Sequence, residues 1–212
     1  MASRPAGRSV KIGEDERTGW SSDRPRRGGA SRPADLTTHC SILRPTDRLR
    51  YSPGSLLIVL AGDPAEREAF VERLIEERGA LITTSRVHAL LRGRVDEAEL
   101  DERAEELMLA AAARRLEARE TVVLGLDDLT PEGREPFVRL AASLRRPRHV
   151  ILVEVPREKV DPDVLPDLNE LRRALESGEL GAEGIQTALR LGGGSASEVK
   201  RILFRPPPRD ET

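Results

Sequence analysis

The stretch LLIVLAGDPAEREAF at residues 56–70 decides the fold. Its first part, residues 56–60, is a continuous run of Leu, Ile and Val, which is typical of a parallel strand buried on both faces. Asp63 followed by Pro64 is a helix-start signal, and apolar residues recur after it at helical spacing. We therefore expect a strand over residues 56–60 and a helix over residues 64–78 whose inner face is formed by Phe70, Val71, Leu74 and Ile75.

The same alternation continues along the chain. Further strands are predicted at 80–84, 121–124 and 149–155, and helices at 87–91, 97–118, from 131 onward, and around 164–175. Residues 185–191 alternate with period two and favour a fifth, edge strand, although a helix is nearly as compatible, and a short element closes the chain at 195–204. Strands alternating with helices predict a three-layer α/β fold with a parallel sheet.

Composition excludes several classes of protein. The formal net charge is −2, aromatic residues are 2% of the chain, and there is one cysteine, Cys40. These values argue against nucleic-acid binding by bulk charge, stacking platforms for single strands, disulfide frameworks and cysteine-rich zinc sites. The sequence has no apolar run of about 18 residues and no secretory leader, so we expect a cytoplasmic protein.

The first 50 residues differ from the rest. They hold 11 Lys and Arg against 6 Asp and Glu, a net charge of +5, whereas the remaining 162 residues hold 24 against 31, a net charge of −7. We expect a disordered basic tail at 1–50, an α/β domain at 51–205 and a second disordered tail at 206–212. The basic tail has an alternative interpretation as an arm that contacts phosphates or an acidic partner.

Several local sequences carry a resemblance. An apolar strand leads into Gly62, Asp128-Leu129-Thr130-Pro131 follows the third strand, and Val155-Pro156-Arg157-Glu158 follows the fourth. With the helix around Leu171, these features make residues 55–155 resemble the P-loop kinase domain of polynucleotide kinases and related ATP-binding proteins. The resemblance implies the strand order 2-3-1-4-5, and a site for ATP and Mg²⁺ at the loop after the first strand.

The loop itself departs from the family pattern. In place of Gly-x-Pro-Gly-Ser-Gly-Lys-Ser/Thr-Thr-Phe, the chain has GDPAEREAF at residues 62–70. The lysine that reaches the β- and γ-phosphates, the hydroxyl that holds Mg²⁺ and two glycines are missing. The chain's three lysines, Lys11, Lys159 and Lys200, are all distant in sequence. A vestigial phosphate loop therefore consists of Gly62, Asp63, Pro64, Ala65 and Arg67.

Acidic residues replace the phosphate ligands. Asp63 and Glu66 are placed to form a capping box around Pro64, in which their carboxylates take the helix N–H groups that otherwise hold phosphate. Together with Glu68 they place three negative charges against Arg67, which makes a triphosphate unfavourable there. Arg67 remains a candidate for phosphate contact, although arginine replaces the lysine point charge poorly.

The other positions that the resemblance implies are also altered. The general base falls on Ser85 or Arg86, and the strand-ending aspartate falls on Gly125. Asp127 and Asp128 are weak candidates for a metal site, and a helix-capping or turn role is favoured for them. In the short acidic lid, Arg157 and Lys159 are the basic candidates, and no residue is assigned a catalytic role.

These losses favour a non-catalytic relative of the family, a pseudoenzyme with a scaffold or regulatory role, no cofactor and another protein as its partner. One alternative is an ATP-dependent kinase or NTPase acting on nucleic-acid ends or a small hydroxyl substrate. It requires Arg67 or Arg86 to replace the lysine, and Asp127 or Asp128 to hold Mg²⁺. A second alternative is a nucleic-acid-binding module that uses the basic tail.

Overall fold

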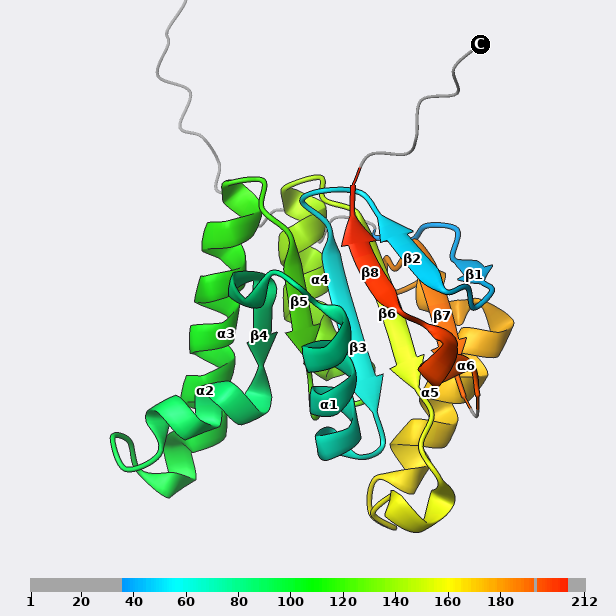
Figure 1. Ribbon diagram of the computed structural model, residues 1–212. Coiled ribbons are helices and arrows are strands. Elements are labelled where there is room, and N and C mark those ends of the chain that lie inside the picture. The colour runs from blue at the N-terminus through cyan, green and yellow to red at the C-terminus, as the bar shows by residue number, and fades with distance from the viewer. Residues whose placement is uncertain (1–35, 193, 206–212) are drawn as a thin grey trace, which may run out of the picture. The chain divides into compact units, whose positions relative to one another are not determined.

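The strand expected at residues 56–60 is β3 (Leu56–Ala61), and it lies in the interior of a six-stranded parallel sheet. The computed structural model in Figure 1 describes residues 36–192 and 194–205. The sheet order is β1-β7-β6-β3-β5-β4, formed with β1 (Ser41–Leu43), β7 (Thr187–Leu191), β6 (Arg148–Val153), β5 (Val122–Gly125) and β4 (Leu81–Thr83). Without β1, this is the predicted order 2-3-1-4-5, and the α/β fold class is confirmed.

The central strand is buried because both of its faces are covered. Leu56, Ile58 and Leu60 belong to a cluster with apolar residues of α3 (Leu100–Glu117), α4 (Pro131–Ser143) and α5 (Leu165–Ser177). Leu57 and Val59 face α1 (Pro64–Leu74) and a two-stranded parallel ladder of β2 (Arg48–Tyr51) and β8 (Arg201–Phe204). Figure 1 shows α1 and this ladder on one side of the sheet.

The helices follow the predicted pattern with shifted ends. The first helix stops at Leu74, and residues 78–80 form a 3-10 turn; α2 begins earlier than expected and spans Thr84–Leu91. Residues 97–99 are a 3-10 turn before α3, and further 3-10 turns lie at Arg157–Lys159 and Glu179–Gly181. A four-residue helix, α6 (Ser195–Glu198), precedes β8. No helix in the described part of the chain is long and apolar enough to span a membrane.

Two expectations about the ends of the domain need correction. Residues 185–191 contain a strand rather than a helix, but β7 is not at the edge because β1 pairs with it. Part of the segment expected as a tail lies in the fold: residues 36–50 contain β1 and the first three residues of β2, and Cys40 and Leu49 are buried. Strands of three and four residues are too short for a clear alternation in sequence. The rest of the predicted tails, at 1–35 and 206–212, lies outside the described residues.

His149 is buried at the start of β6. Its ring centroid lies 4.7 Å from that of Tyr51, and its Nδ1 is 2.8 Å from Oγ1 of Thr187. Neither His149 Nε2 nor the Tyr51 hydroxyl has a hydrogen-bond partner among the described residues. Burial and the nearby charge of Arg148 lower the pKa of His149 to about 4. The folded protein therefore keeps this imidazole neutral at pH values where the unfolded chain protonates it.

We predict that the free energy of unfolding falls as the pH drops from about 6.5 toward 4. The unfolded state binds a proton at His149 near pH 6.5 and the folded state binds it near pH 4, so the loss reaches at most about 3 kcal/mol. Urea unfolding at pH 7.5 and pH 5 measures this difference. The substitution His149→Phe should reduce the difference, whereas His39→Asn, at an exposed position, should leave it unchanged. An equal pH dependence in both variants would contradict the assignment.

Candidate functional site

The residues singled out in the sequence gather at the carboxyl end of the central strands. Gly62 and Asp63 follow β3, Gly125 ends β5, and Ser85 lies in the first turn of α2 after β4. In open parallel sheets, ligands bind at this end, where the strand order reverses. The structure therefore brings the altered positions of the loop and of the neighbouring strands into one region.

The start of α1 is capped by its own chain. Asp63 is the N-cap, and its Oδ1 accepts a hydrogen bond from the Ala65 amide at 2.8 Å, with Pro64 at the first helical position. The expected role of Glu66 is not observed, because its carboxylate forms an ion pair with the Nζ of Lys159 from the lid segment. This ion pair joins the lid to the loop, and the hydrogen bond that Lys159 donates to Glu66 raises the pKa of Lys159.

Gly62 is required by packing against α5. A Cβ at this position would lie 2.8 Å from Cδ2 of Leu168 and 3.1 Å from both methyl carbons of Val160. Distances this short force a neighbour to move, so a side chain at residue 62 conflicts with the packing of the segment 160–168 on the sheet. The first glycine of the loop thus has a structural reason that involves no phosphate.

Arg67 lies in the protein interior. Its side chain is 0% exposed, although the sequence suggested a contact with phosphate. Its Nη1 donates to the carbonyl oxygen of Leu126 at 2.6 Å and lies 2.5 Å from Oδ1 of Asp127. Its Nη2 lies 3.2 Å from Oε1 of Glu68 and 3.4 Å from the hydroxyl of Ser85. The guanidinium therefore joins α1 to the loop after β5 and to α2.

The side chain of Arg67 also explains Gly125. A Cβ on residue 125 would lie 3.0 Å from Nε of Arg67 and 2.9 Å from Cγ2 of Thr83. Any side chain at the end of β5, including the aspartate that the family resemblance implies, conflicts with the arginine in its present place. The glycine at the position where the resemblance implies an aspartate, and the burial of Arg67, are two parts of one arrangement.

Asp127 and Asp128 have different roles. Asp127 faces Arg67, a pairing that the sequence analysis did not anticipate. Asp128 accepts a hydrogen bond from the Thr130 amide at 2.7 Å, and Thr130 caps α4, so the turn role predicted for Asp128 is confirmed. Among the described residues there is no group of three or more His, Cys, Asp or Glu side chains that could hold a metal ion.

Other charged side chains near the same end of the sheet are paired. Arg86 donates to Glu72 at 2.9 Å. Glu154, directly after β6, accepts from Arg172 at 2.9 Å and from Arg190 at 2.7 Å. Partial burial raises the pKa of Glu154, but these two arginines outweigh it, and the net shift is downward. Both Arg86 and Arg172 therefore have protein carboxylates as partners.

A second arginine is buried in the same way as Arg67. Arg134 in α4 is 1% exposed, and its Nε and Nη2 donate to the two carboxylate oxygens of Glu183 at 2.9 and 2.8 Å. Its Nη1 donates to the carbonyl oxygen of Leu129 at 2.5 Å. Each of these arginines therefore fixes the segment between β5 and α4 from one side.

The sequence contains a pattern that indicates the burial of both arginines. Arg67 precedes Phe70, Val71 and Leu74 by three, four and seven residues, and Arg134 has the same spacing to Phe137, Val138 and Ala141. This spacing puts each arginine on the buried face of its helix. Arginines are commonly assigned to solvent-exposed positions, which is why a composition-based interpretation misses them.

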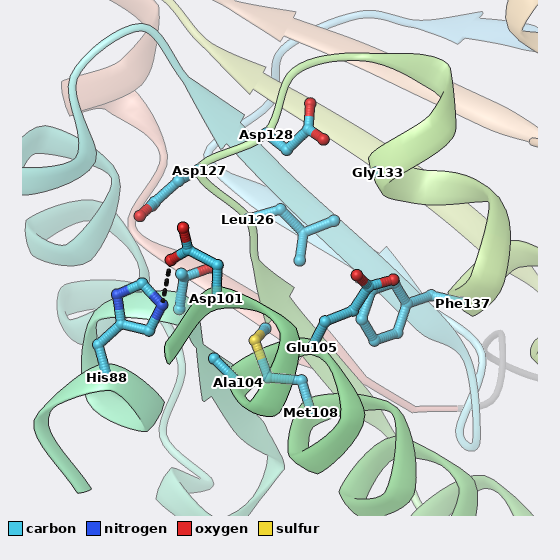
Figure 2. A pocket seen from close by; sticks show the side chains of 11 residues that line it. His88, Asp101, Ala104, Glu105, Met108, Leu126, Asp127, Asp128, Gly133 and Phe137 are labelled. Atoms are coloured by element: carbon cyan, nitrogen blue, oxygen red, sulfur yellow. Dashed lines mark ion pairs between the residues drawn. The ribbon is translucent and has the colours of Figure 1, made fainter. Parts of the chain in front are cut away.

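Two cavities adjoin the segment between β5 and α4. One, of about 350 Å³, is lined by residues of α2, α3, α4 and the loop after β5 (Figure 2). The other, of about 400 Å³, is lined by the start of α4 together with α5 and the turn at 179–181. Both carry several carboxylate side chains on their walls.

The fold defines the class at a coarse level: this is a parallel α/β domain, and its strand order is the one that the resemblance to P-loop kinases implies. No protein-family profile matches the chain, and no curated protein matches it by sequence. Among solved structures, it is similar to the tunicamycin resistance protein of Deinococcus radiodurans, at 14% identity over 72% of this chain and 99% of that one, with a TM-score of 0.36. Likeness at this score carries no argument about function.

We predict that Arg67→Ala destabilises the domain by about 3 kcal/mol, because it leaves a cavity and removes the partner of Asp127 and of the Leu126 carbonyl. The matched control is Arg86→Ala, which removes an exposed ion pair and should cost less than about 0.5 kcal/mol. Urea unfolding of both variants measures the difference. If the two variants are equally stable, the contacts of Arg67 with Leu126 and Asp127 do not stabilise the fold.

We also predict that Gly125→Ala destabilises the protein by about 1–3 kcal/mol, since its Cβ meets Arg67 and Thr83 at about 3 Å. The loss of stability caused by Gly125→Ala should be smaller in an Arg67→Ala background, because the added Cβ no longer meets the side chain of Arg67. A double-mutant cycle on the free energy of unfolding gives the coupling. Strictly additive effects would show that residues 67 and 125 do not constrain each other.

Proposed function

We propose that this chain is a domain of the polynucleotide kinase type that transfers no phosphate and acts by binding another protein. The observation that supports this most strongly is the buried guanidinium of Arg67, which occupies the space at the end of β5 and neutralises Asp127. The position where the resemblance implies an aspartate for Mg²⁺ is thus a glycine, and the nearby Asp127 is ion-paired with Arg67.

The electrostatics at the start of α1 support the same proposal. A phosphate at a helix N-terminus needs free backbone N–H groups and a positive environment. Here the Ala65 amide donates to Asp63, and Glu66 and Glu68 follow in the first two turns. Bringing a triphosphate to this loop places its negative charges beside three carboxylates, and Lys159 is already paired with Glu66.

The alternative of a working ATP-dependent kinase meets a specific obstacle. Arg67 would have to leave its contacts with Leu126, Asp127 and Ser85 before it could reach a phosphate on the surface of the loop. Arg86, the other candidate, lies on the surface of α2 and forms an ion pair with Glu72 of α1. A role in binding leaves these contacts intact, so the non-catalytic function is the better match to the geometry.

We predict that millimolar Mg-ATP and Mg-GTP leave the thermal unfolding midpoint of the full chain unchanged. A nucleotide at one hundred times its Kd would stabilise the folded state by about 2.7 kcal/mol, which corresponds to several degrees for a protein of this size. ATP without Mg²⁺ is the control for unspecific effects of a polyanion. A clear Mg-dependent rise of the midpoint would overturn the proposal and direct attention to assays of phosphoryl transfer.

A further inference from the structure

The cavity of about 350 Å³ in Figure 2 has an apolar floor. Ala104 and Met108 from α3, Leu126 from the loop and Phe137 from α4 line it, and each is at most 5% exposed as a residue. The volume is within the range of small-molecule sites, which combine an apolar lining with a few placed polar groups. An apolar or aromatic group of a ligand can therefore find complementary surface here.

The charged groups of the lining are almost all negative. Asp101 and Glu105 come from α3, and Asp127 and Asp128 from the loop after β5; Figure 2 shows them around the same cavity. The lining contains no lysine or arginine, and its basic group is His88, whose Nε2 lies 3.2 Å from Oδ1 of Asp101.

Within the part of the chain that the structure describes, two of these carboxylates have no cationic partner. Asp127 is compensated by Arg67, and Asp101 faces His88. Among the described residues, Asp128 accepts one hydrogen bond, from the backbone amide of Thr130, and Glu105 has no hydrogen bond or ion pair. A phosphate or another anion in the cavity would face these charges without compensation, whereas a cation would be attracted.

We propose that this cavity binds an organic cation: an ammonium or guanidinium group attached to an apolar body. The apolar body lies on the floor, which includes the ring of Phe137, and the cationic group lies near Glu105 and Asp128 at the charged part of the wall. This inference goes beyond the proposed function, because it holds whether or not the loop at residues 62–70 binds a nucleotide.

Met108 provides a direct reporter of the cavity. The chain has two methionines, Met1 and Met108, so labelling the methionine methyl groups with carbon-13 gives two NMR signals, and Met108→Leu assigns them. Titration of the full chain with 2-phenylethylammonium at millimolar concentrations should shift the Met108 signal in a saturable way. The anion 3-phenylpropionate, which has a similar shape, should not shift it.

Variants that remove a charge test which carboxylates contribute to binding of the cation. Glu105→Gln combined with Asp128→Asn should weaken binding of 2-phenylethylammonium about tenfold, and the asparagine can still accept the hydrogen bond from Thr130. Glu102→Gln is the matched control, because it removes one exposed charge from the same helix outside the cavity lining, and it should change the affinity less than twofold. An unshifted Met108 signal in the ligand-free variants shows that the cavity is intact.

Three results would overturn the proposal: no saturable shift with the amine, equal binding of the anion, or equal affinities in the double variant and the control.

The cation could come from a free amine or from a side chain of a partner protein. A short peptide with one arginine between two leucines distinguishes the sources. Saturation at lower concentration by the peptide assigns a protein side chain, tighter binding of the amine assigns a free molecule, and both support a cation site.

Discussion

The arrangement at the carboxyl end of the sheet depends on the burial of one guanidinium, that of Arg67. Its donors satisfy the carbonyl of Leu126 and the carboxylate of Asp127, and they extend to Glu68 and Ser85. A buried charge of this kind is tolerated only when it is paired and hydrogen-bonded. The loop after β5 must therefore approach α1 closely, and residue 125 must lack a side chain.

Much of the fold could be predicted from the sequence because its strands are short, continuous apolar runs. The run at 56–60 has no polar position, so it belongs inside a sheet with both faces covered, and the alternation with helices then gives the parallel order. The short strands at the ends of the domain were harder to predict. β1, β2 and β8 are only three or four residues long, and their pairing depends on contacts between distant parts of the chain.

The sequence shows which residues of the family pattern are missing at the site, but it does not show how the remaining side chains are arranged. Comparison with the family pattern shows that a lysine and an aspartate are missing, and Asp63 as a helix cap follows from local chemistry. That Arg67 points inward, and that Asp127 pairs with it, requires the distance between α1 and the loop after β5, which no local pattern contains. The position of Arg67 on the apolar stripe of its helix is the available hint.

The charges at this end of the sheet are unfavourable for a bound anion. Arg67, Lys159 and Arg172 are each paired with a carboxylate of the same chain. Among the described residues, two carboxylates of the neighbouring cavity have no such partner, and we propose that they attract cations. We propose that a domain with these properties uses the parallel sheet as a rigid support and presents a surface suited to partners of positive charge.

The most direct test of this account is a crystal structure of the full chain grown with Mg²⁺ and a non-hydrolysable ATP analogue at millimolar concentration. We predict that the guanidinium of Arg67 lies against the Leu126 carbonyl and Asp127, and that no nucleotide is bound over the start of α1. A structure in which Arg67 has turned outward and contacts a bound phosphate would contradict the central claim.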